Sequence, residues 1–275
     1  MKVAALQMVS GSQLQTNLDQ AQALLQQASQ AGAELAVLPE YFCLMGQRET
    51  DKLALAEAHG SGPIQDFLAA AARQYGLWVV GGTLPLQSPV PGRVANACLV
   101  FDPSGAPVAR YDKIHLFCYD NGRERYDEAA VLVAGSAPVA FDLDDRSGQR
   151  WRVGLSVCYD LRFPELYRHL AADLLLVPAA FTHGTGQAHW ELLLRARAIE
   201  NLAFVAASAQ GGQHDNGRQT WGQSLLIDPW GVVLAQRASG PGVVLAELDW
   251  ARLQQVRQQL PALQHRRLHT APCQP

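Results

Sequence analysis

Short apolar runs alternate with longer stretches of helical periodicity along most of the chain. Several of the short runs contain almost no polar residue, which is typical of strands in a sheet that is covered on both faces. We expect strands at Val3–Met8, Leu35–Pro39, Leu77–Thr83, Ala95–Phe101, Val108–Asp112, Val153–Val157, Leu174–Val177, Phe204–Ser208, Ser224–Ile227 and Val243–Leu248. The alternation of strands and helices predicts an α/β fold.

The segments between the strands contain helical signals. Asn17 is placed to cap a first helix, and Gly32 follows its expected end. Pro63 is a favoured residue in a first helical turn, and Gly76 stands where that second helix should end. The predicted helices are Asn17–Ala31, Pro63–Gly76, Pro164–Ala172 and Trp190–Asn201.

Residues 95–112 differ from the strand–helix units around them. Two strands are joined there by a turn at Asp102–Gly105, as in a hairpin. This predicts a mixed sheet rather than a purely parallel one. A length of 275 residues suits one α/β unit, and no linker or repeat interrupts it. We therefore expect a single domain over residues 1–260 and a proline-containing tail over residues 261–275.

Composition narrows the possible functions. Apolar residues make up 48% of the chain and charged residues 17%, and the net charge is −3 without a basic run. A nucleic-acid or anionic-membrane partner is therefore not expected. The N-terminal residues lack the pattern of a signal peptide, and no apolar run reaches membrane-spanning length, so we expect a cytoplasmic protein.

Five cysteines are present, at positions 43, 98, 118, 158 and 273. Their odd number, their irregular spacing and the lack of a CxxC pair argue against a disulfide framework and a zinc site. His115, His183 and His189 also lack a recognised metal-ligand spacing, so structural roles are expected for them. One cysteine remains a candidate nucleophile.

Cys158 stands where a predicted strand passes through a turn into a helix. The carboxyl edge of an α/β sheet is where ligands bind, and we expect the thiol to be exposed there. The start of the following helix and the N–H groups of the turn would favour a thiolate. For a single cysteine, a buried residue at a strand end is the commoner explanation.

Two other strands end in chemically useful residues. Glu40 follows a wholly apolar strand, where partly dry surroundings would raise the pKa of the carboxyl group towards that of a usable base. Lys113 is flanked by Ile114 and Phe117, which favours a lysine held against the protein. Each residue has an ordinary explanation on its own, but the combination of Glu, Lys and Cys at strand ends is more specific.

The sequence resembles the nitrilase superfamily of carbon–nitrogen hydrolases over nearly its whole length. The motifs that carry the resemblance are Leu38–Glu40, Tyr111–Leu116 and Ser156–Glu165, which match the Glu, Lys and Cys blocks of that family in order. Within it, the chain is most similar to the Nit1-type branch, amidases that act on deaminated glutathione. That finer likeness is carried by Ala180–Glu191, Arg195–Asn201 and Asp228–Gly231.

The resemblance implies a four-layer α-β-β-α sandwich with mixed sheets and a small linear amide as substrate. Cys158 would attack the carbonyl, and Glu40 would accept the thiol proton, return it to the leaving amine and activate water against the thioester. Lys113 and the backbone N–H of Tyr159 would stabilise the oxyanion. No metal or organic cofactor is needed for these steps, and none is expected.

The resemblance also suggests roles for residues outside this triad. Glu128 matches a second glutamate that orients the lysine, although it lies in a charged stretch where a solvated loop acid is the alternative. The chain departs from the commoner family pattern at Cys118–Asp120. Arg162 matches an arginine that binds a substrate carboxylate; a salt bridge with Asp160 or Glu165 is equally plausible.

Phe181, Thr182 and Thr185 follow another predicted strand and are expected to line the pocket, although packing alone would explain Phe181. In the following helix, Glu191 and Arg195 have the spacing of a supporting ion pair. The family resemblance places this helix at a subunit interface, so at least a homodimer is expected.

The alternatives within the same chemistry are an ω-amidase acting on α-ketoglutaramate or α-ketosuccinamate, or a carbamoyl hydrolase. A nitrilase is disfavoured by the sequence after Cys158, and an ammonia-supplying glutaminase by the lack of a second domain. From other classes, a catalytically silent scaffold is disfavoured because all three triad residues are present. A thiol-redox role is disfavoured because no resolving cysteine lies near Cys158 in sequence.

Overall fold

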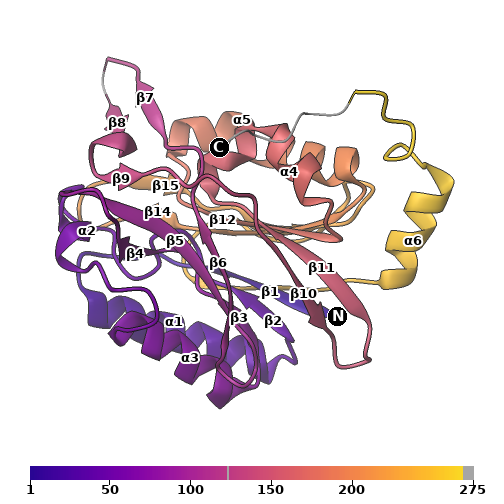
Figure 1. The fold of residues 1–275 in the computed structure, drawn as a ribbon, viewed down its shortest axis with the longest axis horizontal. Helices are drawn as coiled ribbons and strands as arrows, with labels where there is room; N and C mark the ends of the chain where they lie inside the picture. Colours follow the sequence, from indigo (N-terminus) through magenta and orange to yellow (C-terminus); the bar gives the residue numbers. More distant parts are fainter. Residues whose placement is uncertain (123, 269–275) are drawn as a thin grey trace.

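Two large β-sheets lie face to face at the centre of the protein, with helices on both outer faces (Figure 1). The computed structural model describes residues 1–122 and 124–268. The first sheet has the order β18 (Gly242–Glu247), β1 (Lys2–Gln7), β2 (Leu35–Val37), β3 (Trp78–Val80), β5 (Val94–Phe101) and β4 (Leu84–Gln87), with β6 (Pro107–Asp112) and β9 (Leu132–Val133) also paired to β5. The second has the order β10 (Ala140–Asp144), β11 (Arg150–Leu155), β12 (Leu174–Ala179), β13 (Phe204–Ala209), β16 (Ser224–Ile227) and β17 (Val233–Arg237).

Both sheets are mixed, as the sequence predicts. In the first, β1, β2 and β3 run parallel while β18 and β5 join them in the antiparallel sense. In the second, β11, β12 and β13 run parallel while β10 and β16 are antiparallel to their neighbours. The carboxyl ends of the central parallel strands therefore lie together at one edge of each sheet.

Each sheet buries apolar side chains on both faces, which explains why its central strands read as continuous apolar runs. Val3 and Ala5 belong to the core between the sheets, whereas Ala4 and Leu6 face the core beneath the helices. This alternation follows from the two-residue period of a strand. The helices α1 (Leu14–Gln30) and α3 (Pro63–Tyr75) cover the first sheet, and α4 (Pro164–Leu170) and α5 (His183–Asn201) cover the second (Figure 1). The four-layer α-β-β-α sandwich is confirmed.

The boundaries of two helices differ from those predicted. The first helix begins before Asn17, whose side-chain amide instead bonds the backbone of Gly11 and the carbonyl of Cys43, so it is not a cap. The helix α5 begins at His183 rather than at Trp190. The predicted ends at Gly32 and Gly76 are confirmed by their left-handed φ angles of +82° and +60°.

Several short elements were not predicted. They are the sheet strands β4, β9, β10 and β17, the helices α2 (Asp51–Ala54) and α6 (Trp250–Gln259), the hairpins β7–β8 (Cys118–Asp120, Arg125–Asp127) and β14–β15 (Gly211–Gln213, Gln219–Trp221), and the 3₁₀ turns η1 (Glu128–Ala130) and η2 (Cys158–Arg162). Of the predicted tail, residues 261–268 contain no helix or strand, and residues 269–275, with Cys273, lie outside the described part. Within the described part, no helix is both long and apolar enough to span a membrane.

Candidate active site

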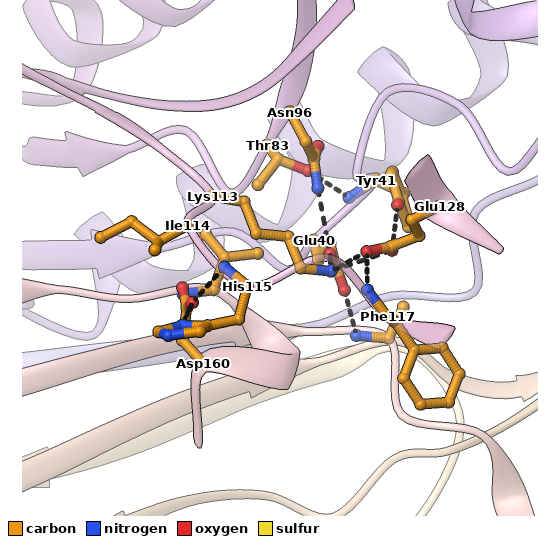
Figure 2. A network of polar contacts seen from close by, with 12 residues as sticks. Glu40, Tyr41, Thr83, Asn96, Lys113, Ile114, His115, Phe117, Glu128 and Asp160 are labelled. Carbon is orange, nitrogen blue, oxygen red and sulfur yellow. Dashed lines mark hydrogen bonds and ion pairs between the residues drawn. The ribbon is translucent and has the colours of Figure 1, made fainter. Parts of the chain in front are cut away.

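Three chain segments bring Glu40, Lys113 and Cys158 together near the strand ends. Glu40 lies beyond β2, Lys113 directly follows β6, and Cys158 is the first residue of η2 after β11. All three are at least nine-tenths buried. Residues far apart in sequence thus form one enclosed polar centre, as the combination of strand ends predicts. Figure 2 shows the contact of Glu40 with Lys113 in this centre.

The ammonium group of Lys113 lies between two carboxylates. Its Nζ is 2.9 Å from Oε1 of Glu40, 2.9 Å from Oε1 of Glu128 and 2.8 Å from Oε2 of Glu128. Burial alone would lower the pKa of Lys113, but the charges of Glu128 and Glu40 hold this pKa well above its usual value. Lys113 therefore remains a cation, and the expectation that it is held within the protein is confirmed.

Glu40 is fixed through both of its carboxylate oxygens. Oε1 accepts hydrogen bonds from Lys113 and from Nδ2 of Asn96 at 3.0 Å, and Oε2 accepts one from the backbone N–H of Ala180 at 3.0 Å. Burial raises the pKa of Glu40, while Lys113 lowers it and the charge of Glu128 raises it further. The net pKa shift is upward, as predicted for an acid leaving an apolar strand, and it strengthens the carboxylate as a base.

Cys158 differs from the prediction in its exposure and in its resting charge. The residue is buried, and burial raises the pKa of its thiol well above the usual value, helped by the charge of Glu40 and a hydrogen bond to it. Lys113 acts in the opposite direction but does not compensate. The turn therefore does not stabilise a resting thiolate, because desolvation and a neighbouring carboxylate outweigh any effect of the short helix.

The backbone is strained at two positions in this centre. Cys158 has a φ of +50°, and Tyr41, directly after Glu40, has a φ of +57°. Left-handed φ values are rare for residues other than glycine and collect at functional sites, where the surrounding contacts hold them. The N–H of Tyr159 follows the strained cysteine and donates to no protein acceptor among the described residues.

Asp160 ties the turn of Cys158 to the segment of Lys113. Its Oδ2 accepts from the N–H of Val157 at 2.8 Å and from the hydroxyl of Tyr111 at 2.7 Å. Its Oδ1 accepts from the backbone N–H of His115 at 3.0 Å and lies 2.7 Å from Nδ1 of that ring. One fully buried carboxylate therefore sets the position of Cys158 relative to Lys113.

Glu128 is part of the same centre, and the alternative of a solvated loop acid is wrong. Its carboxylate accepts from the hydroxyl of Tyr41 at 2.8 Å and the N–H of Phe117 at 2.7 Å, besides Lys113. Burial alone would raise the pKa of Glu128, but Lys113 and these donors hold it below its usual value. Glu128 is therefore an ionised partner that orients the ammonium group (Figure 2).

These groups lie beside a pocket. Glu40, Glu128 and Cys158 lie in its wall, together with the predicted lining residues Tyr159, Arg162, Phe181, Thr182 and Thr185. Thr182 and Thr185 bond each other through their hydroxyl oxygens at 2.7 Å, at the start of α5. Phe181 packs against Trp190 as well as lining the pocket, so both expectations for it hold.

Arg162 lines this pocket, and its predicted salt bridge is absent. Among the described residues it forms no ion pair with Asp160 or Glu165; Nη2 lies 3.3 Å from Nδ1 of His189. Its guanidinium group lies over the ring of Tyr159 at 5.9 Å and over that of Phe181 at 5.6 Å. These contacts fix the plane of the guanidinium group and leave its charge without a carboxylate partner.

Four further pocket residues were not predicted, namely Tyr41, Phe117, Ala180 and Arg218. Tyr41 and Phe117 adjoin predicted motifs, so their neighbourhood was a usable signal. Arg218 lies in the β14–β15 hairpin, which no sequence signal indicated.

The three histidines each have a protein neighbour: His115 bonds Asp160, His183 packs against Trp221, and His189 lies beside Arg162. Over residues 1–122 and 124–268 there is no group of three or more metal-ligand side chains.

Comparison with known proteins decides the family. Residues 2–258 match the family model of carbon–nitrogen hydrolases. The chain belongs to this family. It is an enzyme that hydrolyses carbon–nitrogen bonds in amides, within the nitrilase superfamily.

Three relatives show how widely the likeness extends. A deaminated glutathione amidase from Synechocystis sp. is 44% identical over 96% of this chain and 97% of the relative. The omega-amidase NIT2-A from Xenopus laevis is 34% identical over 97% of this chain and 95% of the relative. The crystal structure of the Caenorhabditis elegans NitFhit protein has a TM-score of 0.88 and 36% identity to this chain. The likeness covers 97% of this chain and 65% of that chain.

Proposed function

We propose that this carbon–nitrogen hydrolase acts on a small linear amide whose acyl part carries a carboxylate, with deaminated glutathione as its substrate. The observation that carries the proposal is the buried Glu40–Lys113–Glu128 network beside the thiol of Cys158. The amidase from Synechocystis sp. supports the choice of substrate.

In the first step, Sγ of Cys158 forms a bond to the amide carbon while its proton passes to Glu40. The raised pKa of the thiol means that this proton is still in place when substrate arrives, so Glu40 must accept it during attack. The raised pKa of Glu40 suits that role, because it makes the carboxylate a stronger proton acceptor.

The negative charge that develops on the carbonyl oxygen needs donors that are already in place. The N–H of Tyr159 and the ammonium group of Lys113 are the candidates. Glu128 keeps Lys113 charged and oriented, so no rearrangement is needed during the reaction. Preorganised donors of this kind typically contribute about 3 kcal/mol each to the stability of the transition state.

Glu40 then gives its proton to the leaving nitrogen as the carbon–nitrogen bond breaks, and a Cys158 thioester remains. A water molecule, deprotonated by the same carboxylate, attacks the thioester carbon; the acid product leaves and the thiol is re-formed. Arg162 holds the substrate carboxylate with its unpaired guanidinium group, while Phe181, Thr182 and Thr185 form the wall beside the acyl chain.

An ω-amidase acting on α-ketoglutaramate is the second candidate. The amphibian omega-amidase supports it, since it covers nearly the whole chain. Both substrates yield α-ketoglutarate, but one releases a dipeptide and the other releases ammonia. The mechanism is the same for both, so the difference lies in what the pocket accepts beyond the scissile nitrogen.

Exposed apolar side chains support a homodimer through α5. Leu192 on this helix is 70% exposed, and Ile199, Trp230 and Val232 are also exposed. Glu191 and Arg195 form their ion pair at 3.7 Å on the same helix. Light scattering of the purified protein tests this assignment; a monomer at micromolar concentration would contradict it. A cytoplasmic location stays a prediction.

The function is tested by measuring α-ketoglutarate formed from deaminated glutathione and from α-ketoglutaramate. Ammonia release is measured for a simple aliphatic nitrile as a third compound. Turnover of deaminated glutathione that is lost in Cys158→Ala and kept in Cys118→Ala supports the proposal. Cys118 is a suitable control because it is exposed. Turnover of α-ketoglutaramate alone would favour the second candidate, and no Cys158-dependent turnover would contradict both.

A further inference from the structure

The pocket contains a second guanidinium group, that of Arg218. This residue lies in the hairpin between β14 and β15, and it lines the same pocket as Arg162 and Cys158. The hairpin is joined to the start of α5, because Thr220 pairs with Thr182. Arg218 is therefore brought to the pocket by tertiary contacts and not by its place in a motif.

Contacts with the segment of Glu49 and with strand β8 fix the position of Arg218. Nη1 lies 3.4 Å from Oε1 of Glu49, and the guanidinium carbon lies 5.2 Å from the centre of the Tyr126 ring. Glu49 is shared with Lys52 and its side chain is 44% exposed, so it neutralises Arg218 only weakly. An arginine has five N–H donors, and the pair with Glu49 engages one nitrogen. Donors therefore remain for a ligand.

The charged groups of the pocket differ in burial. The carboxylates of Glu40 and Glu128 are buried and are balanced in part by Lys113. Arg162 and Arg218 are only partly buried; Arg162 has no ion-pair partner among the described residues, and Arg218 has a partly solvated one. Two guanidinium groups in one pocket favour an anionic ligand.

Two arginines exceed what a substrate with one carboxylate requires. Arg162 packs on Phe181 and bonds His189, whereas Arg218 packs on Tyr126 and pairs with Glu49, so the two share no contact. A linear amide extends from the scissile bond in two directions, through its acyl part and through its amine part. Arg162 serves the acyl part in the proposed function, which leaves the amine part for Arg218.

We propose that Arg218 binds a carboxylate carried by the leaving amine, so that the site selects amides with an anionic group on each side of the scissile bond. The inference rests on the proposed function for the acyl side. Deaminated glutathione has this form, because its glycine carboxylate belongs to the leaving dipeptide. α-Ketoglutaramate does not, because it releases ammonia.

Calorimetric binding to the Cys158→Ala protein tests this inference without turnover. Adding Arg218→Gln should weaken binding of deaminated glutathione about 10- to 100-fold, the effect of losing one charge-assisted contact, and change the Kd of α-ketoglutaramate less than about twofold. Equal weakening of both ligands, unchanged binding of both, or failure of the parent protein to bind deaminated glutathione would overturn the inference.

A matched variant separates binding from the integrity of the hairpin. Glu49→Gln removes the carboxylate that pairs with Arg218 and leaves the charge of Arg218 unchanged. Deaminated glutathione should therefore bind to this variant at least as tightly as to the parent Cys158→Ala protein. Weakening by Glu49→Gln as large as that by Arg218→Gln would show that both act through the fold and would overturn the inference. Failure of the proposed function gives a different result, namely no Cys158-dependent turnover by the otherwise unmodified enzyme.

Discussion

Nζ of Lys113 lies 2.9 Å from Oε1 of Glu40, and both side chains are closed off from solvent. The pair brings the candidate oxyanion donor and the candidate base within a single hydrogen bond. Glu128 makes the arrangement possible by adding a second carboxylate at 2.8 Å. A buried ion group of this kind depends on every member, because removal of one leaves the others uncompensated.

Lys113→Met should reduce both activity and stability. The loss of an oxyanion donor lowers kcat by about 10²- to 10³-fold. The two carboxylates left without a cation lower the free energy of unfolding by about 3–5 kcal/mol. Amide hydrolysis and urea denaturation measure the two effects. Lys2→Met is the control, because the side-chain ammonium group of Lys2 is exposed and bonds the carbonyl of Ala31.

The double variant Lys113→Met/Glu128→Gln separates the two effects of Lys113. Removing one carboxylate together with the cation should restore part of the stability, since less unpaired charge is buried, while hydrolysis stays as low as in Lys113→Met. A double variant that regains activity along with stability would contradict the catalytic role of Lys113.

The stability of the protein should depend on the ionisation of Glu128. The pKa of Glu128 is lowered on folding, so its contribution is present above the ordinary value of 4.5 and is lost as the pH falls through the lower, folded-state pKa. Between about pH 5.5 and about pH 3.5, the free energy of unfolding should therefore fall more in the wild type than in Glu128→Gln.

Urea denaturation at the two pH values gives this comparison, and Glu191→Gln is the matched control. Glu191 is an exposed acid on α5, with its side chain 48% accessible. The free energy of unfolding of Glu191→Gln should show the pH dependence of the wild type. The assignment of Glu128 as an ionised partner in the folded state fails if Glu128→Gln loses as much stability on acidification as the wild type does.

Asp160→Asn should displace Cys158, although Asp160 itself does not line the pocket. An amide nitrogen in place of one oxygen faces donors such as the N–H of Val157, and each buried donor left unpaired costs about 1–3 kcal/mol of stability. A shift of the Cys158 turn should lower kcat roughly 10- to 100-fold with little change in KM. Kinetics and denaturation measure these changes.

Asp144→Asn provides the comparison, because it removes an exposed pair with Arg150 at 2.9 Å and should leave the free energy of unfolding nearly unchanged. Wild-type kcat in a stable Asp160→Asn protein would show that Asp160 is not needed to position Cys158.

The strand ends carrying the triad could be predicted because each follows a strongly apolar run, and the family motifs fixed their identity. The charge state of Cys158 could not be predicted, because it depends on burial and on Glu40, which is distant in sequence. Arg218 could not be found for the same reason: Glu49 and Tyr126, which hold it, are distant in sequence.

The start of α5 shows how tertiary contacts override local propensity. Gly184 and Gly186 disfavour a helix, so the sequence predicts a later start at Trp190. In the structure, a Cβ atom on Gly186 would lie 2.3 Å from the side chain of Trp221, so glycine is required there by the hairpin packed on the helix. The same packing places Thr182 and Thr185 in the pocket.

Acid-quenched mass spectrometry during turnover of deaminated glutathione detects the proposed thioester. We expect an α-ketoglutaryl group, bound as a thioester, on the peptide that contains Cys158 and on no peptide containing Cys43, Cys98 or Cys118. Neither adduct nor product should form in Cys158→Ala. Continued formation of α-ketoglutarate by Cys158→Ala, or an adduct on another residue, would overturn the assignment of Cys158 as the nucleophile.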